Sequence, residues 1–238
     1  MGIIRNLSPA EILAQVVFSR REAAARGLPS VDNIVFMGMG EPLDNPDGLV
    51  QALQALTDPN RFDFSKSKVL VSTVAPSPQA LQVLSTLDCQ IAWSLHAPDD
   101  ALRKSLVPST RHTLQQLRDG MAQILAERAR RGALHSLILE YVLLQDVNDS
   151  LLHAQALAAF LEPLHSVTRD SNKPQRSRTG LLVNLIPFNQ GTAEAEGLNG
   201  FKRPSRTRVR AFQVRIYFAL AVLALKYLTL GTNISNLI

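Results

Sequence analysis

The sequence predicts an α/β fold with a parallel sheet, and two observations predict it. Five short apolar segments have the length of buried strands, and segments with helical periodicity separate them. Parallel strands need long crossovers, and we expect those crossover helices to cover both faces of the sheet. A barrel or partial barrel is favoured over an open sheet, although periodicity alone leaves both architectures open. The predicted strands are residues 33–37, 68–72, 90–95, 137–142 and 181–186.

The first predicted element is a helix that begins after Ser8. Ser8 is a good N-cap, Pro9 suits the first helical position, and Glu11 completes a capping box. Val16 lies on the apolar stripe of this helix, and Gly27 ends it. Further helices are predicted over about residues 47–56, 78–86, 101–106, 114–130 and 150–160.

The composition indicates one globular domain in a reducing compartment. Of the 238 residues, 46% are hydrophobic and 19% are charged, so the chain can bury a full core. The single cysteine, Cys89, excludes a disulfide framework and any zinc or iron–sulfur site that takes three or four thiolates from this chain. Residues 1–10 lack the apolar core of a signal peptide, and nothing before residue 214 is apolar enough to cross a membrane.

Charge is divided unevenly along the chain, which has a net charge of +5. Residues 1–165 hold 14 basic and 17 acidic residues, whereas residues 166–238 hold 11 basic and 3 acidic residues, a net charge of +8. This asymmetry suggests a polyanionic partner for the C-terminal third, and the alternative is a solvated basic segment without a partner. Charge alone leaves both interpretations open.

The C-terminal third contains three segments of different composition. Residues 166–179 are basic without apolar periodicity, which predicts an exposed loop or a disordered insertion. Residues 201–215 carry six basic residues and no acid, and residues 216–225 are uninterruptedly apolar. Because this apolar run is too short to span a bilayer, a buried terminal helix or a mispredicted stretch of sequence is favoured over a membrane contact. We therefore divide the chain into a core domain, residues 1–213, and an apolar tail, residues 214–238.

Residues that can bind a ligand follow four of the predicted strands, where parallel βα folds collect their ligands. A glycine-rich turn with Glu41 follows the first strand, Ser72 ends the second, Ser94 and His96 follow the third, and Asn189 follows the last. Each has a structural alternative: Glu41 could cap the next helix, Ser72 could simply end a strand, and His96 could be a packing residue. The other four histidines show no metal spacing. The functional interpretation depends on all these positions lying at one edge of the sheet.

These motifs resemble the RlmN/Cfr radical SAM RNA adenine methyltransferases. The resemblance runs in order from about residue 2 to about residue 213. The segments that carry it are Met-Gly-Met-Gly-Glu-Pro-Leu at 37–43, Ser-Leu-His-Ala-Pro at 94–98, Glu-Tyr-Val-Leu-Leu at 140–144 with Val-Asn-Asp at 147–149, and Asn-Leu-Ile-Pro-Phe-Asn at 184–189.

The resemblance implies a partial (β/α)₆ radical SAM barrel that binds S-adenosylmethionine (SAM). It also implies methyl transfer to carbon 2 of an adenine in large-subunit ribosomal RNA (rRNA), with transfer RNA (tRNA) as a substrate of some members. The methionine amino group of SAM would be held by Gly40 and Glu41. Its ribose and carboxylate would be lined by Ser72, Ser94, Leu95 and His96, and the pocket would be closed by Asn189.

Two features of the family are missing from this chain. The family holds a [4Fe-4S] cluster with a three-cysteine loop that would precede Gly2, and it carries the methyl group on a cysteine beyond the point, near Val214, where this sequence diverges. Cys89 precedes an interior strand instead of following it, so it cannot substitute for the methyl-carrying cysteine. We therefore expect a barrel without its first strand and cluster loop, with no catalytic or metal-ligating residue of its own. We also expect a fragment that is inactive as written.

Three functional hypotheses follow. The first is the radical SAM RNA methyltransferase, represented here by its cofactor pocket. The second is a non-catalytic RNA-binding remnant of that enzyme, and coding sequence for the three-cysteine loop upstream of Met1 would favour the first over the second. The third is a membrane-associated protein tethered by residues 216–230, which detergent partitioning with and without the tail would test. We expect a monomer in the cytoplasm, with rRNA as partner and no stable membrane contact; the inserted basic segment leaves a chloroplast or other organelle as the alternative location.

Overall fold

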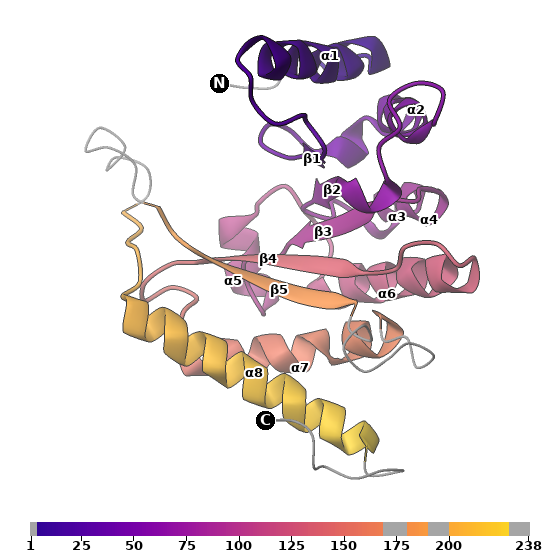
Figure 1. Cartoon of the computed structure of the whole chain (residues 1–238). Coiled ribbons are helices and arrows are strands. Elements are labelled where there is room, and N and C mark those ends of the chain that lie inside the picture. Colours follow the sequence, from indigo (N-terminus) through magenta and orange to yellow (C-terminus); the bar gives the residue numbers. More distant parts are fainter. Residues whose placement is uncertain (1–3, 169–179, 190–199, 229–238) are drawn as a thin grey trace.

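The computed structural model describes residues 4–168, 180–189 and 200–228, with side chains up to residue 220. Its five strands form one parallel sheet in the order β1-β2-β3-β4-β5 (Figure 1). All five predicted strands are confirmed to within one residue at either end, and the α/β fold class with them. The strands are β1 (Ile34–Phe36), β2 (Val69–Thr73), β3 (Gln90–Ser94), β4 (Leu137–Leu143) and β5 (Leu181–Pro187).

The first helix forms for the reasons that the sequence indicates. The Ser8 side chain accepts a hydrogen bond from the backbone N–H of Glu11, and the Glu11 side chain accepts one from the backbone N–H of Ser8. Gly27 follows the helix with a φ of 64°, a left-handed conformation that glycine adopts without strain. The helices are α1 (Pro9–Ala25), α2 (Pro46–Thr57), α3 (Pro78–Leu81), α4 (Val83–Thr86), α5 (Asp100–Leu106), α6 (Leu114–Arg130), α7 (Leu151–Thr168) and α8 (Arg206–Leu228), with the 3₁₀ turns η1 (Pro42–Asp44) and η2 (Lys66–Lys68).

Two helix predictions differ from the structure in their bounds. The helix expected over residues 78–86 is divided at Gln82 into α3 and α4. Helix α7 continues past residue 160 to Thr168, with Pro163 inside it. Residues 166–168 of the predicted exposed loop are therefore helical, and residues 169–179 lie outside the described residues.

The expectation that helices cover both faces of the sheet is wrong. Leu137 and Leu139 of β4 point to the helical face and are fully buried, whereas Val35 and Leu182 point to the other face and are 48% and 59% exposed. The physical reason is that right-handed crossovers between strands in strictly sequential order place every helix on the same side. This one-sided arrangement is that of a partial barrel, whose uncovered face is the barrel interior.

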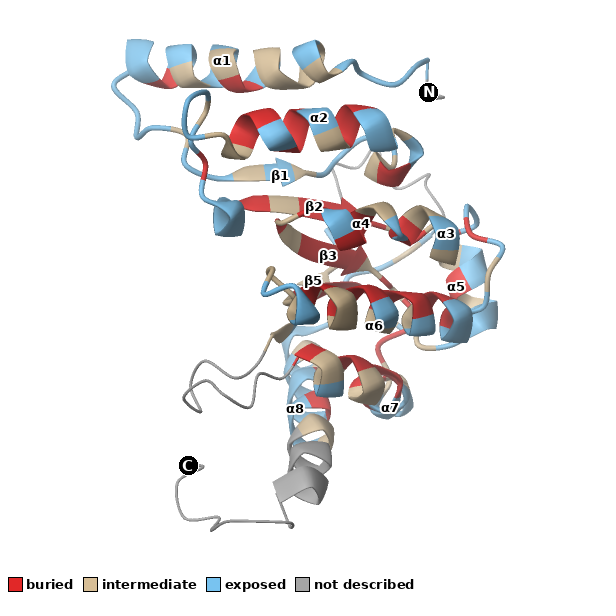
Figure 2. Ribbon diagram, turned by 90° about the vertical axis from the view of Figure 1, so that its right-hand side faces the viewer, coloured by how far each residue is buried: buried red, intermediate tan, exposed pale blue. Residues whose placement is uncertain are grey.

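Up to residue 220, where its side chains are described, helix α8 is buried along one face only. Phe212 is fully buried and its ring lies 5.6 Å from that of Tyr141, and Ile216 is buried with it. Tyr217 and Phe218 are more than half exposed. Figure 2 shows the contrast between the largely buried strands β2 and β3 and the largely exposed sides of α1 and α8. A terminal helix is therefore present as predicted, but the part of it whose side chains are described, residues 206–220, is buried on one face only.

The predicted boundary at residues 213 and 214 falls inside α8, which passes through it without a break. The division between core and tail thus has no counterpart in an element end, and the role of the tail stays a prediction. Among the described residues, none of the helices combines the length and the apolar character that a bilayer span requires.

Candidate functional site

The carboxyl ends of the strands meet at one edge of the sheet, because all four strand pairs are parallel. A pocket of about 130 Å³ opens there, between the turn after β1 and the ends of β2 and β3. Four of the seven predicted SAM-binding residues line it, namely Gly40, Glu41, Ser72 and Ser94. Strand pairing therefore brings positions that are more than 50 residues apart in the chain to one pocket.

The glycines of the turn after β1 leave space for a ligand. Gly38 and Gly40 have φ values of 115° and 72°, a region that side-chain-bearing residues rarely adopt. A Cβ built on either residue would meet no atom within 4 Å. The glycines are thus needed for the backbone conformation, and the open space beside them lets a ligand approach the backbone closely.

Glu41 connects this turn to the neighbouring strand. Its Oε1 accepts a hydrogen bond of 3.0 Å from Leu43 N–H, and its Oε2 accepts one of 2.8 Å from Val74 N–H. Burial raises the pKa of the Glu41 carboxyl, and the hydrogen bonds from Leu43 and Val74 oppose that shift. Glu41 caps η1, which confirms the structural alternative that it caps the helical turn after it. Each carboxylate oxygen still has a second lone pair for a cationic ligand.

A row of polar side chains crosses the barrel interior next to Glu41. The hydroxyl oxygens of Ser72 and Ser94 lie 3.5 Å apart, and Ser94 Oγ lies 3.5 Å from Glu140 Oε2. Glu140, which faces Ser94 in the register of β3 and β4, is buried. Glu140 belongs to the Glu-Tyr-Val-Leu-Leu motif at residues 140–144 but was not among the predicted site residues. The signal that could have found it is a carboxylate in the middle of an apolar strand.

Arg103 is a second residue that the sequence analysis missed. It is 2% exposed, and its guanidinium donates hydrogen bonds to the carbonyls of Ser94, Leu95 and Val74. These carbonyls belong to the ends of β2 and β3, so α5 fixes both strand ends through one side chain. Burial lowers the pKa of Arg103 to about 10, which leaves it charged at neutral pH.

The other three predicted site residues lie outside the lining of this pocket. Leu95 is fully buried and packs in the core, so only its backbone faces the strand ends. His96 has a φ of 63°, and its Nδ1 accepts a hydrogen bond from Val142 N–H. Burial, helped by the charge of Arg103, lowers the pKa of His96 to about 4. Asn189, which follows β5, is exposed.

His96 and Asn148 together fix the turn after β3 to the end of β4. The side-chain amide of Asn148 donates to the carbonyls of His96 and Val142, at 2.8 and 2.7 Å, and its Oδ1 accepts from Leu144 N–H. His96 therefore holds the neighbouring strand end, as a neutral imidazole whose Nδ1 is an acceptor. Its Nε2 carries the proton and remains available as a donor.

The described residues do not fit an iron–sulfur cluster. No group of three or more His, Cys, Asp or Glu side chains among them could hold a metal ion. Cys89 is fully buried, and burial raises the pKa of its thiol. A buried, protonated thiol is a poor metal ligand, and one thiol cannot supply three ligands.

Fold and site together define a class of protein: a partial βα barrel with a glycine turn, a carboxylate and two hydroxyls at the strand ends, as in radical SAM enzymes. A crystal structure of a radical SAM methyltransferase from Sphaerobacter thermophilus is similar, with a TM-score of 0.75 and 32% identity, over 92% of this chain and 57% of that one. A domain of pyruvate-formate lyase-activating enzyme from Bacteroides vulgatus, 14% identical with a TM-score of 0.50, shares the fold alone.

Sequence comparison narrows the class to one family. The chain is 37% identical over 219 residues to the dual-specificity RNA methyltransferase RlmN of Magnetococcus marinus, covering 92% of this chain and 54% of that protein. RlmN of Syntrophotalea carbinolica is 36% identical over 89% of this chain and 49% of its own length. No protein-family model matches the chain. The chain is similar to RlmN RNA methyltransferases and to a radical SAM methyltransferase, and it spans about half the length of the curated relatives that it matches.

Proposed function

We propose that this chain forms the SAM-binding part of an RNA methyltransferase that acts on carbon 2 of adenine in large-subunit rRNA. The observation that carries the proposal is the convergence of Gly40, Glu41, Ser72 and Ser94 on one pocket at the strand ends. A carboxylate suits the ammonium group of SAM, and hydroxyl groups suit its ribose and carboxylate. SAM would supply the methyl group and the radical chemistry when bound.

The residues of the chain itself bind and orient in this proposal. Glu41 would hold the amino group while it keeps the turn after β1 against β2, and Ser72 and Ser94 would face the rest of the cofactor. Arg103 and His96 would keep the strand ends in place. The chain supplies no cluster ligands, so no step of the reaction is assigned to its residues. A monomer in the cytoplasm, with rRNA as the first substrate and tRNA as a second, completes the proposal; the named relatives are bacterial.

Calorimetry with SAM tests this function. The wild-type chain should bind SAM, and Ser94→Ala should weaken binding, because the variant removes a hydroxyl from the pocket. Ser105→Ala removes an exposed hydroxyl on α5 and is the matched control. If the wild-type chain shows no affinity for SAM, or if both variants bind equally well, the pocket is not a SAM site.

A second candidate function is a non-catalytic RNA-binding protein derived from this family. It is favoured by the single cysteine, which cannot support a cluster. This candidate predicts RNA binding without measurable SAM affinity. The same calorimetry, combined with RNA binding to the same preparation, separates the two functions.

A further inference from the structure

A second pocket lies at the carboxyl end of β5, apart from the candidate SAM pocket. Its volume is about 390 Å³, and its lining comes from Pro187 at the end of β5, from the segment before α8 and from the first turns of α8. Three arginines belong to this lining, namely Arg203, Arg206 and Arg210. Neither family resemblance nor the strand-end motifs point to these residues.

The three arginines have no partner within the described part of the chain. All three are exposed, and no described carboxylate forms an ion pair or hydrogen bond with them. The first turn of α8 contains no acidic residue. Arg206 and Arg210 are one helical turn apart, so they lie on the same side of α8. The pocket thus concentrates positive charge that nothing described in the chain neutralises.

Arg208, between them in sequence, has a different role. Its guanidinium lies 2.7 Å from Asp146 Oδ1 and 3.0 Å from Asp149 Oδ2, in the loop between β4 and α7. The Lys202 carbonyl also accepts a hydrogen bond of 2.9 Å from Gln145 N–H of that loop. These contacts fix the start of α8 against the strand ends. The pocket is therefore preformed, and its three unpaired arginines are not needed to maintain its shape.

An anion fits this arrangement better than any other ligand class. Guanidinium groups bind phosphate oxygens with two parallel hydrogen bonds, and a helix N-terminus adds unpaired N–H groups and a favourable dipole. We propose that this pocket binds a backbone phosphate of the RNA that the candidate SAM site modifies. The inference rests on the proposed function. RNA is the favoured source of the phosphate because the pocket lies at the same sheet edge as the SAM pocket, where a bound strand must pass.

The test measures the salt dependence of binding between the full chain and a fluorescent single-stranded oligoribonucleotide. Removing a phosphate contact lowers the slope of log affinity against log salt by about 0.7 on single-stranded RNA. We expect Arg206→Ala with Arg210→Ala to lower the slope by at least that amount and to weaken low-salt binding at least about tenfold. Arg206→Lys with Arg210→Lys keeps the charge, so it should retain the slope.

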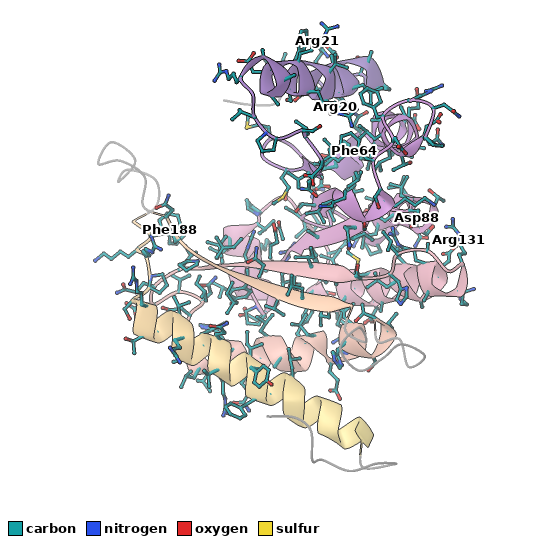
Figure 3. All side chains as sticks on the ribbon, viewed as in Figure 1. Arg20, Arg21, Phe64, Asp88, Arg131 and Phe188 are labelled. Carbon is teal, nitrogen blue, oxygen red and sulfur yellow. The ribbon has the colours of Figure 1, made fainter. Side chains whose placement is uncertain are left out.

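The control is a double variant, Arg21→Ala with Arg130→Ala, which removes the same charge elsewhere. Arg21 lies on α1, and Arg130 is the last residue of α6, next to Arg131. Figure 3 shows Arg131 at the end of the molecule opposite Phe188, which follows β5 beside the proposed pocket. This variant should keep the slope within the error of the wild type. Melting temperatures of all variants should agree, because none of these arginines has a described partner.

The outcomes separate this inference from the proposed function. If the wild type binds RNA and the alanine pair at positions 206 and 210 keeps its slope, the phosphate site is wrong while the RNA-binding function stands. If the wild type binds no RNA, both fail. If inorganic phosphate binds equally to the wild type and the alanine pair, or if the pair loses binding to phosphatidylserine vesicles while its RNA binding is unchanged, the pocket is not an RNA phosphate site.

Discussion

The Oε2 atom of Glu41 lies 2.8 Å from the backbone nitrogen of Val74, and this hydrogen bond joins the turn after β1 to the end of β2. The same carboxylate caps η1 through Leu43. Glu41 therefore holds the shape of the candidate SAM pocket whether or not it also binds the cofactor. For any substitution of Glu41, both the free energy of unfolding and the SAM affinity must therefore be measured.

The substitution Glu41→Gln should reduce both stability and SAM affinity. Gln presents one acceptor and one donor group, so one of the two backbone N–H groups loses its partner, which costs about 1–2 kcal/mol of unfolding free energy. Loss of the charge should weaken SAM binding by about 1.5–3 kcal/mol. Chemical denaturation and calorimetry measure the two effects separately. Equal SAM affinities would assign Glu41 to capping alone.

The affinity for SAM should also depend on pH through Glu41. Its pKa is raised by burial, so protonation removes the carboxylate charge at a higher pH than for an exposed glutamate. Binding should therefore weaken as the pH falls through this raised pKa. Calorimetry of the wild type and Glu41→Gln over a pH series makes the comparison, and the variant should lack this component. An identical pH profile in both proteins would contradict the prediction.

Replacement of Arg103 by Met should destabilise the fold strongly. The methionine fills much of the same volume but leaves the carbonyls of Ser94, Leu95 and Val74 without their donor, a cost of about 2–4 kcal/mol. Lys104→Met changes an exposed neighbour on α5 and should cost less than about 0.5 kcal/mol. Urea denaturation compares the two variants. Similar midpoints would show that the strand ends do not depend on Arg103.

The pKa of His96, lowered from 6.5 to about 4, makes a component of stability depend on pH. Between pH 6.5 and about 4, His96 binds a proton more readily in the unfolded state than in the folded state. The free energy of unfolding therefore keeps its full value above pH 6.5 and falls as the pH drops toward 4. His96→Asn should remove this component, because Asn does not titrate, accepts a hydrogen bond and tolerates a positive φ. Denaturation midpoints across the window measure it, and a variant with an unchanged slope would argue against it.

The chain alone should fail to assemble a [4Fe-4S] cluster. One buried thiol cannot replace three thiolate ligands. Anaerobic reconstitution with iron and sulfide should leave substoichiometric iron, no cluster absorbance above that of the Cys89→Ala control, and no 5′-deoxyadenosine on reduction with SAM present. A stable cluster with turnover would require ligands beyond those identified here.

Much of the fold follows from local sequence. Each strand is recognisable because a run such as residues 181–186 is apolar and bounded by polar segments, and α1 is recognisable from its capping box. The coverage of the sheet was not recognisable, because apolar strand runs do not report the order in which strands pair. Only the sequential pairing of β1 to β5 shows that Val35 and Leu182 face an uncovered interior.

The candidate site, like the fold, could be predicted only in part from the sequence. The sequence by itself determined that Glu41, Ser72 and Ser94 lie at the strand ends, because residue type and position along a strand are local properties. Tertiary structure decided which of them share a pocket, since that depends on register across strands. It also decided that Arg208 pairs with Asp146 and Asp149 while its neighbours do not. The sequence shows a run of equivalent arginines, and only long-range packing makes them different.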